Sequence, residues 1–230
     1  MSYAVKEIYY TLQGEGANTG RAAVFCRFAG CNLWSGRESD RASAVCAFCD
    51  TDFVGTDGPG GGRFATPQAL TDAVANAWPA HDRVPGGTAR NGSESSPTSA
   101  ARPLVVCTGG EPLLQMDEPL IDALHERGFA VAVETNGTRH PPAGLDWICV
   151  SPKAEAQLVL ERGDELKLVY PQQEPEAQPE CFESLEFVHF FLQPMDGPER
   201  ERNTRLAIEY CLANPKWRLS LQTHKLVGLR

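Results

Sequence analysis

The sequence has no apolar run that approaches the length of a membrane span, and its N-terminus has no basic segment followed by an apolar one. It also lacks an excess of positive charge, because 21 Lys and Arg residues stand against 30 Asp and Glu residues, a formal net charge of -9. A protein that binds nucleic acid through its phosphates needs clustered Lys and Arg. We therefore expect a cytoplasmic protein that acts on a small molecule, with neither a membrane nor a nucleic acid as its partner.

Disulfide bonds are not expected, although the chain has eight cysteines. Three of these, Cys26, Cys107 and Cys149, lie in apolar, strand-like runs, where a free cysteine behaves as a small hydrophobic residue. Cysteines in such positions fit a reducing compartment better than a secreted disulfide scaffold.

Short apolar runs alternate with helical patterns along the 230 residues, which predicts one α/β domain (1–230) with a parallel sheet. Apolar residues recur at three- and four-residue spacing near 67–78, 116–127 and 199–212, so we expect helices there. Segments 55–63 and 81–103 are rich in Gly, Pro or Ser and are predicted as loops, the second as a flexible surface insertion.

Most of the strand-like runs pass directly into polar or glycine-rich residues. In parallel sheets and barrels the carboxyl ends of the strands form the ligand-binding face, so we expect these groups to converge on one site. Each group taken alone is also consistent with a turn or a helix cap. The groups are Thr108-Gly109-Gly110-Glu111, Glu134-Thr135-Asn136-Gly137, Ser151-Pro152-Lys153, Gln193-Pro194-Met195-Asp196 and Gln222-Thr223-His224-Lys225.

Three cysteines, Cys31, Cys46 and Cys49, follow a C-x14-C-x2-C spacing. A structural zinc site uses four ligands and a disulfide uses two, whereas a metal centre that binds its own substrate leaves one position open. Thiolate ligation of an iron–sulfur cluster is the simplest explanation of three. A zinc site that borrows a histidine, or inert buried thiols, are the alternatives, and no histidine lies within a few residues of the closing pair.

The three cysteines, the aromatic residue in Cys46-Ala47-Phe48-Cys49 and the downstream TGGEPLL together resemble the radical S-adenosylmethionine superfamily. The usual spacing there is C-x3-C-x2-C, and this chain has eleven more residues between the first two thiols. Within that superfamily the chain resembles the 7-carboxy-7-deazaguanine synthases, several members of which lengthen this loop. The matching segments, in chain order, are TLQGEG (11–16), VFCRFAGCNL (24–33), CDT (49–51), TGGEP (108–112), ETNGT (134–138), SPK (151–153) and QTHK (222–225).

The resemblance implies a reduced, TIM-like (β/α) barrel with fewer helices than strands and an extended cluster-binding loop, working as a homodimer. It implies conversion of 6-carboxy-5,6,7,8-tetrahydropterin into 7-carboxy-7-deazaguanine with loss of ammonia, a step toward queuosine and other 7-deazapurines. The implied cofactors are a 4Fe-4S cluster, S-adenosylmethionine and Mg2+, with reduced flavodoxin or a similar electron donor. Two other functions stay open: an activase that generates a glycyl radical in a large protein partner, and a non-enzymatic zinc-binding module.

The resemblance also implies a set of cofactor ligands. From the residues themselves, Glu111 is suited to accept hydrogen bonds from an ammonium group, while Glu134 or Lys153 could instead pair with another charge at the barrel rim. Thr51 is the implied Mg2+ ligand, with Asp50 as its rival. The cluster ligands are Cys31, Cys46 and Cys49, and the residues implied to bind S-adenosylmethionine are Ala47, Phe48, Asp50, Gly109, Gly110, Glu111, Glu134, Ser151, Pro152, Lys153 and Gln193.

The residues expected to bind the pterin come from three parts of the chain. Gln13 offers both a donor and an acceptor to a pyrimidine-like edge, and Arg27 can fork onto a carboxylate. An internal ion pair between Arg27 and Glu15 is the competing interpretation of that arginine. The full expected set is Leu12, Gln13, Gly14, Glu15, Arg27, Cys107, Thr108, His224 and the terminal carboxylate of Arg230.

Overall fold

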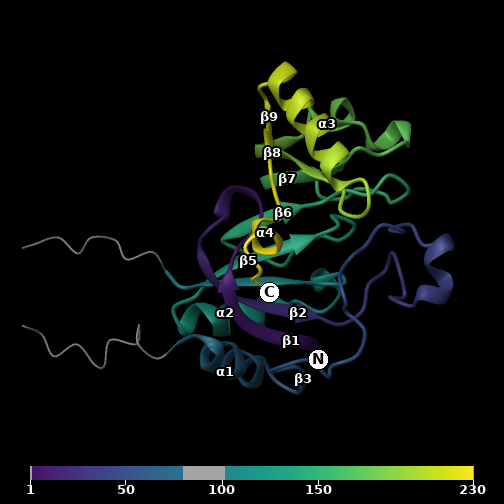
Figure 1. Cartoon of the computed structure of the whole chain (residues 1–230). Coiled ribbons are helices and arrows are strands. Elements are labelled where there is room, and N and C mark those ends of the chain that lie inside the picture. The colour runs from purple at the N-terminus through teal and green to yellow at the C-terminus, as the bar shows by residue number, and fades with distance from the viewer. Residues whose placement is uncertain (1, 80–101, 230) are drawn as a thin grey trace, which may run out of the picture.

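The computed structural model describes residues 2–79 and 102–229 of the chain (Figure 1). The predicted insertion at 81–103 therefore lies outside the described residues, apart from its last two.

One nine-stranded sheet runs through the described chain, in the order β3-β1-β2-β4-β5-β6-β7-β8-β9. Every neighbouring pair from β2–β4 through β8–β9 is parallel, which confirms the predicted sheet. Strand β1, in contrast, pairs antiparallel with both β2 and β3. Neither β1 nor β3 was expected, and β3 begins inside the segment that was predicted as a loop. The strands are β1 (Tyr3–Leu12), β2 (Ala22–Phe28), β3 (Gly62–Phe64), β4 (Leu104–Gly109), β5 (Ala130–Thr135), β6 (Trp147–Val150), β7 (Arg162–Tyr170), β8 (Glu186–Pro194) and β9 (Trp217–Leu219).

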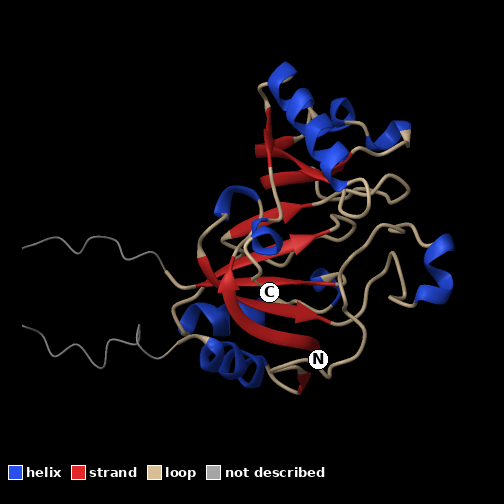
Figure 2. Cartoon of the chain, viewed as in Figure 1, coloured by secondary structure: helices blue, strands red, loops and turns tan. Residues whose placement is uncertain are grey.

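The three predicted helices are present as α1 (Pro67–Ala77), α2 (Glu118–Glu126) and α3 (Arg200–Ala213). They lie at the outside of the sheet, α1 and α2 beside one another and α3 at the opposite end near β8 and β9 (Figure 2). A single turn, α4 (Thr223–Leu226), follows β9 and contains most of the last predicted strand-end polar group. In residues 2–79 and 102–229, no helix combines the length and the apolar character needed to cross a membrane.

Short 3-10 helices occupy several connections between these elements. They are η1 (Gly16–Asn18), η2 (Glu38–Ser43), η4 (Pro112–Leu114), η5 (Pro175–Ala177) and η6 (Pro179–Phe182). The described fold thus has more strands than α-helices and matches the expected reduced (β/α) barrel.

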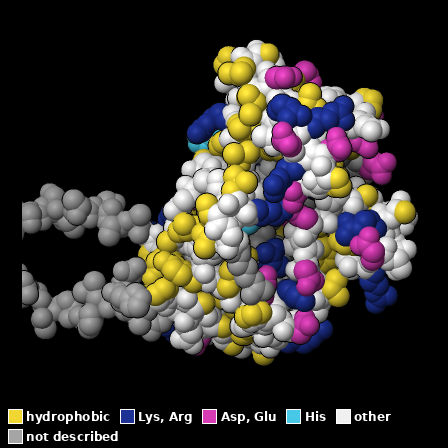
Figure 3. All heavy atoms as spheres, in the orientation of Figure 1, with side chains coloured by type: hydrophobic (Ala, Val, Ile, Leu, Met, Phe, Trp, Pro, Cys, Tyr) yellow, Lys and Arg dark blue, Asp and Glu magenta, His cyan; other side chains and the backbone are white. Residues whose placement is uncertain are grey.

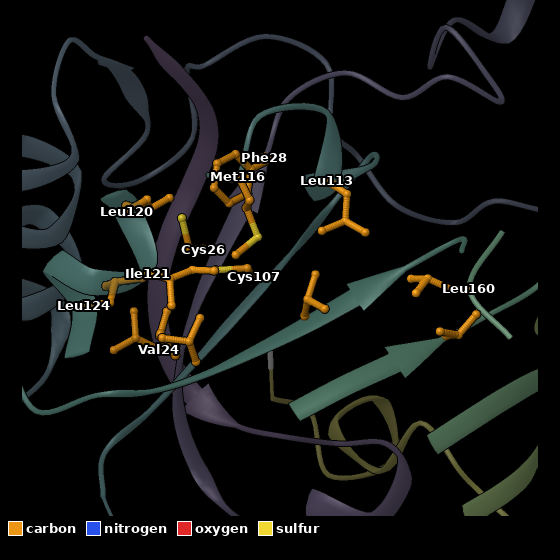
Figure 4. Packing of buried hydrophobic residues seen from close by; sticks show 14 of the residues in the cluster. Val24, Cys26, Phe28, Cys107, Leu113, Met116, Leu120, Ile121, Leu124 and Leu160 are labelled. Atoms are coloured by element: carbon orange, nitrogen blue, oxygen red, sulfur yellow. The ribbon is translucent and has the colours of Figure 1, made fainter. Parts of the chain in front are cut away.

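Alternation along the strands separates two faces of the sheet. On β7, Leu166 and Leu168 pack in the larger hydrophobic cluster on the helix side, so Lys167 between them points to the other face. On β4, Cys107 belongs to the helix side, and Figure 4 shows it beside Ile121 of α2. A smaller apolar cluster on the opposite face contains Ala23, Leu104, Val106, Ala130 and Ala132.

Strand β1 is joined to α2 through a buried hydrogen bond. Asp117 caps the helix by accepting from the backbone N–H of Leu120 at 3.1 Å, and it also accepts from the hydroxyl of Tyr3 at 2.6 Å. The Tyr3 side chain is almost fully buried, and burial raises its pKa, as does the bond to Asp117. The cap therefore also satisfies a buried hydroxyl.

We expect Asp117→Ala to lower the free energy of unfolding by about 2–3 kcal/mol, since it removes a helix cap (~1 kcal/mol) and leaves the Tyr3 hydroxyl without its partner (~1–2 kcal/mol). Denaturant unfolding measures this loss. Tyr3→Phe in the Asp117→Ala background should cost little more, because the hydroxyl no longer has an acceptor to lose. Fully additive effects would contradict the assignment.

Candidate active site

A cavity of 450 Å³ opens at the carboxyl ends of the parallel strands. All five of the strand-end polar groups reach it, together with residues from β1, β2 and β7. Figure 3 shows basic and acidic side chains interspersed on the face of the molecule that it displays, with neither sign gathered into a large patch. The prediction that these groups converge is confirmed.

The three thiols lie on one wall of this cavity. Cys31 follows β2, while Cys46 and Cys49 follow the extended loop, and of the eight cysteines, all within the described residues, no others line the cavity. A hydrogen bond from the Cys46 thiol lowers the pKa of Cys49, and burial raises the pKa of Cys31. Three converging sulfurs, one already disposed to ionise, are a suitable donor set for an iron–sulfur cluster.

Gly109 and Gly110 bring β4 against the backbone that leads into the cluster loop. Gly109 has a φ of 123°, and a Cβ on it would lie 2.2 Å from the carbonyl oxygen of Phe28. A Cβ on Gly110 would lie 2.0 Å from the carbonyl oxygen of Gly30, next to Cys31. The sequence predicted that this pair permits close approach to a ligand. The structure shows that it also permits close approach to the segment carrying the first thiol.

Glu111 differs from the prediction. Its carboxylate is fully buried and accepts from the N–H of Leu113 at 2.9 Å, the hydroxyl of Thr135 at 2.7 Å and the N–H of Asn136 at 2.8 Å. Burial raises its pKa despite these donors. The side chain ties β4 to the end of β5 and does not line the cavity, so it is not placed to accept bonds from an ammonium group there.

Lys167 of β7 was not among the predicted residues. It lies at the centre of a group of bonded polar side chains in the cavity, here named the polar wall (Gln13, Glu15, Glu134 and Lys167). Its Nζ is 2.6 Å from Glu15 and 2.8 Å from Glu134, and its side chain is 5% exposed. Burial by itself would lower the pKa of Lys167, but the acidic groups around it, Cys149, Glu134 and Glu15 among them, hold it above its ordinary value. A lysine between two core leucines on a strand is a sequence signal that could have identified it.

The carboxylate of Glu15 is held by this lysine. Burial raises its pKa, but the charge of Lys167 and hydrogen bonds from Lys167 and Gln222 outweigh burial and lower the pKa to about 2. Glu134 also accepts from Gln13 at 3.1 Å. Glu134 does pair with a charge, that of Lys167, and it also lines the cavity.

Arg27 faces the cavity, but its internal partner is not Glu15. Its Nε donates to Glu7 at 2.9 Å and its Nη2 donates to the hydroxyl of Tyr9 at 2.9 Å. Glu7 stands directly opposite Arg27 in the antiparallel pairing of β1 with β2, so the ion pair follows from the strand register. The competing interpretation that paired Arg27 with Glu15 is wrong, because Glu15 is bound to Lys167.

Gln13 is already engaged inside the protein. Besides donating to Glu134, its Oε1 accepts from the N–H of Glu15 at 3.1 Å, and the side chain is buried. Within residues 2–79 and 102–229, Lys153 forms no ion pair: its Nζ donates to the hydroxyl and the carbonyl oxygen of Ser151 at 2.8 and 2.7 Å. Burial lowers the pKa of Lys153.

The C-terminal turn closes one side of the cavity. Thr223 donates twice to the carbonyl oxygen of Gly14, and a Cβ on that glycine would lie 2.1 Å from Nδ1 of His224. Burial lowers the pKa of His224, which lines the cavity. Lys225 bridges Asp50 and Asp196, each at 2.6 Å. The terminal residue, Arg230, lies outside the described residues.

Four further predicted residues do not line the cavity. Cys107 is buried on the helix side of the sheet, which contradicts a role for its thiol in substrate binding. Pro152 is also buried, Ala47 is exposed and Gly14 packs against His224. The predicted residues that do line it are Leu12, Gln13, Glu15, Arg27, Cys31, Cys46, Phe48, Cys49, Asp50, Thr51, Thr108, Gly109, Gly110, Glu134, Ser151, Lys153, Gln193 and His224.

A partial parallel barrel with three thiols beside the carboxyl ends of its strands is the arrangement of a radical S-adenosylmethionine enzyme. No protein-family model matches the chain. Individual proteins do match: it is 61% identical over 229 residues to the 7-carboxy-7-deazaguanine synthase of Bordetella pertussis and 62% identical over 230 residues to that of Bradyrhizobium diazoefficiens, each alignment covering 100% of both chains. The crystal structure of QueE from Escherichia coli superposes with a TM-score of 0.65 at 30% identity, covering 96% of this chain and 94% of that one.

The chain belongs to the 7-carboxy-7-deazaguanine synthase family. Membership carries with it the iron–sulfur cluster and S-adenosylmethionine of radical enzymes of this class. It also decides against a glycyl-radical activase and against a zinc-binding module.

We expect Lys167→Met to lower the free energy of unfolding by about 3–5 kcal/mol at pH 7, because it leaves two largely buried carboxylates, 17% and 18% exposed, without their counter-charge. The ordinary pKa of Glu15 is 4.5 and its folded value is about 2, so this contribution is complete above about pH 4.5 and is lost as the pH falls toward 2. The variant can protonate its carboxylates, so its deficit should shrink between pH 7 and pH 4. Denaturant titrations at each pH measure it.

Lys225→Met is the matched control, since this lysine also bridges two carboxylates but is 31% exposed. Its loss should cost no more than about 1 kcal/mol. Equal losses for the two lysines would show that burial does not increase the contribution of the Lys167 ion pairs to stability.

Proposed function

We propose that this chain converts 6-carboxy-5,6,7,8-tetrahydropterin into 7-carboxy-7-deazaguanine with loss of ammonia, in the biosynthesis of queuosine and related 7-deazapurines. One observation carries the proposal: the three thiols and the polar strand ends line a single cavity at the carboxyl edge of the sheet. Identity of about 60% over the full length of synthases from several bacteria supports the same reaction.

In this proposal Cys31, Cys46 and Cys49 hold a 4Fe-4S cluster. The bound cluster and S-adenosylmethionine would supply the radical that begins the rearrangement of the pterin ring. The protein orients both molecules and excludes water from the space between them. The cavity-lining residues that would bind S-adenosylmethionine are Phe48, Asp50, Gly109, Gly110, Glu134, Ser151, Lys153 and Gln193.

The pterin would lie beside S-adenosylmethionine in the same cavity. Leu12, Gln13, Glu15, Arg27, Thr108 and His224 line this cavity and present donors and acceptors for a fused heterocycle and a carboxylate. Because Gln13 and Glu15 are fixed by neighbours before any ligand arrives, little side-chain entropy is lost on binding.

A divalent ion completes the proposed site. Mg2+ favours a few protein oxygens together with substrate and water oxygens. Lys225 already neutralises Asp50, whereas the neighbouring Thr51 lines the cavity without that competition, so Thr51 is the better candidate. Reduced flavodoxin or a similar donor, and a homodimeric assembly in the cytoplasm, are the remaining parts of the proposal.

The proposal is tested by reconstituting the protein anaerobically with iron and sulfide and incubating it with S-adenosylmethionine and a reductant. Formation of 5'-deoxyadenosine is expected, and addition of the carboxypterin should yield the deazapurine. Wild-type protein that binds no cluster, or that leaves the pterin unchanged, would reject the proposal.

Alanine at any one of Cys31, Cys46 or Cys49 should abolish cluster binding and 5'-deoxyadenosine formation, because three thiolates are the minimum set. Iron content and visible absorption measure the first effect. Cys181→Ala is the control, since that cysteine is exposed and is not among the residues that line the cavity. Comparable loss in this control, with the fold intact, would refute the ligand assignment.

Arg27→Lys should weaken pterin binding by about one to two decades, because it keeps the charge but loses a planar pair of donors worth ~1.5–3 kcal/mol. Calorimetric titration of the reconstituted protein measures the affinity. Glu7→Gln is the control: it breaks the internal ion pair and leaves the guanidinium in place. If both variants lose the same affinity, Arg27 acts by supporting β1 and not by contacting the carboxylate.

A further inference from the structure

All the residues between Cys31 and Cys46 form one segment, here named the cluster loop (residues 32–45). It contains η2 and projects from the sheet on the side away from α1 and α2, at the right of Figure 1. The cysteine spacing alone does not indicate a role for this loop. Its contacts with the Cys46–Cys49 segment do indicate one.

Arg41 connects the loop to the Cys46–Cys49 segment. Its Nη1 donates to the carbonyl oxygen of Ala47 at 2.8 Å and to that of Cys49 at 2.9 Å. Its Nε lies 2.8 Å from both carboxylate oxygens of Glu38. One guanidinium thus holds two carbonyl groups within the Cys46–Cys49 segment, one before and one after Phe48.

A fixed aromatic surface supports the guanidinium. The Arg41 side chain lies 4.2 Å above the ring of Trp34, a cation–π contact. Trp34 is buried, packs edge-on against Phe53 with ring centroids 5.6 Å apart, and donates through Nε1 to the carbonyl oxygen of Arg37 at 3.2 Å. Arg41 is therefore held by the ring, by Glu38 and by the two carbonyl groups.

We propose that Arg41 is a positioning residue for the iron–sulfur cluster: it fixes the backbone between Cys46 and Cys49 in the geometry the cluster needs. This inference rests on cluster binding by the three thiols, as proposed above. Partners that orient the backbone of metal ligands typically change metal retention about 10–100-fold. The guanidinium also neutralises Glu38, so its removal leaves a negative charge near the thiol pair, which disfavours the reduced, more negative state of a cluster and lowers its reduction potential.

Arginine suits this position better than lysine. Its planar group donates to two carbonyls and a carboxylate while it lies flat on an aromatic ring, whereas a lysine ammonium is a compact point charge. Arg41→Lys thus keeps the charge and loses the geometry, while Arg41→Gln loses both. Arg37→Gln makes the same change of charge in the same loop, at an exposed side chain whose backbone, not its guanidinium, makes the contact described above.

The experiment reconstitutes the wild type and the three variants with iron and sulfide. It then measures iron loss to a chelator and the cluster potential by a titration followed by electron paramagnetic resonance. Arg41→Gln should lose iron about 10–100-fold faster than the wild type and show a more negative potential. Arg41→Lys should lose iron nearly as fast but keep a potential close to that of the wild type, and Arg37→Gln should match the wild type in both.

Indistinguishable behaviour of Arg41→Gln and Arg37→Gln would overturn the proposal. The melting temperature of each apo protein is measured first, because the contacts of Arg41 are confined to the cluster loop and the thiol pair and should leave the sheet intact. An apo Arg41→Gln that does not fold would also overturn it, since the residue would then serve the whole fold. A wild type that takes up no cluster would instead reject the proposed function.

Discussion

The two ion pairs of Lys167 join three segments that lie far apart in the sequence: the loop after β1 through Glu15, β5 through Glu134, and β7 itself. A buried ammonium between two carboxylates is stable only while all of its partners are in place, because each charge left alone in the interior costs several kcal/mol. The position of the polar wall is therefore set by the sheet. Strand β7 supplies the lysine because its neighbours Leu166 and Leu168 are fixed in the core.

The loop at residues 13–17 depends on the same arrangement. Glu165 accepts from the N–H of Ala17 at 2.8 Å, and Gly16, at a φ of 64°, packs so closely that a Cβ would lie 2.3 Å from the Glu165 carboxylate. In the same loop, the carbonyl oxygen of Gly14 accepts hydrogen bonds from the N–H and the hydroxyl of Thr223 in the C-terminal turn. Through these contacts, the strand that carries Lys167 orders both the first and the last segments that line the cavity.

Much of the fold and of the candidate site could be predicted from the sequence, and the features that were missed share a physical cause. The bounds of β2 and β8 follow from short, mainly apolar runs, and the polar strand ends follow from the edge at which parallel strands finish. Strand β1 was missed because it mixes Lys6 and Glu7 with aromatic residues, and its identity depends on antiparallel pairing with β2. Without that pairing the partner of Arg27 could not be found, which is why Glu15 was named in place of Glu7. That Cys107 faces the helix side of the sheet follows only once the register is known.

Three cationic side chains that line the cavity are already ion-paired before any ligand enters. Arg27 is matched by Glu7, Lys225 by Asp50 and Asp196, and Lys167 by Glu15 and Glu134. A carboxylate that approaches Arg27 therefore meets an ion pair and not an isolated cation, and its attraction depends on the direction of the guanidinium donors more than on net charge. If Arg27 binds the substrate carboxylate as proposed, discrimination between pterins that differ in that group depends on donors fixed by strand pairing, since a ligand without it would leave guanidinium donors unpaired and desolvated.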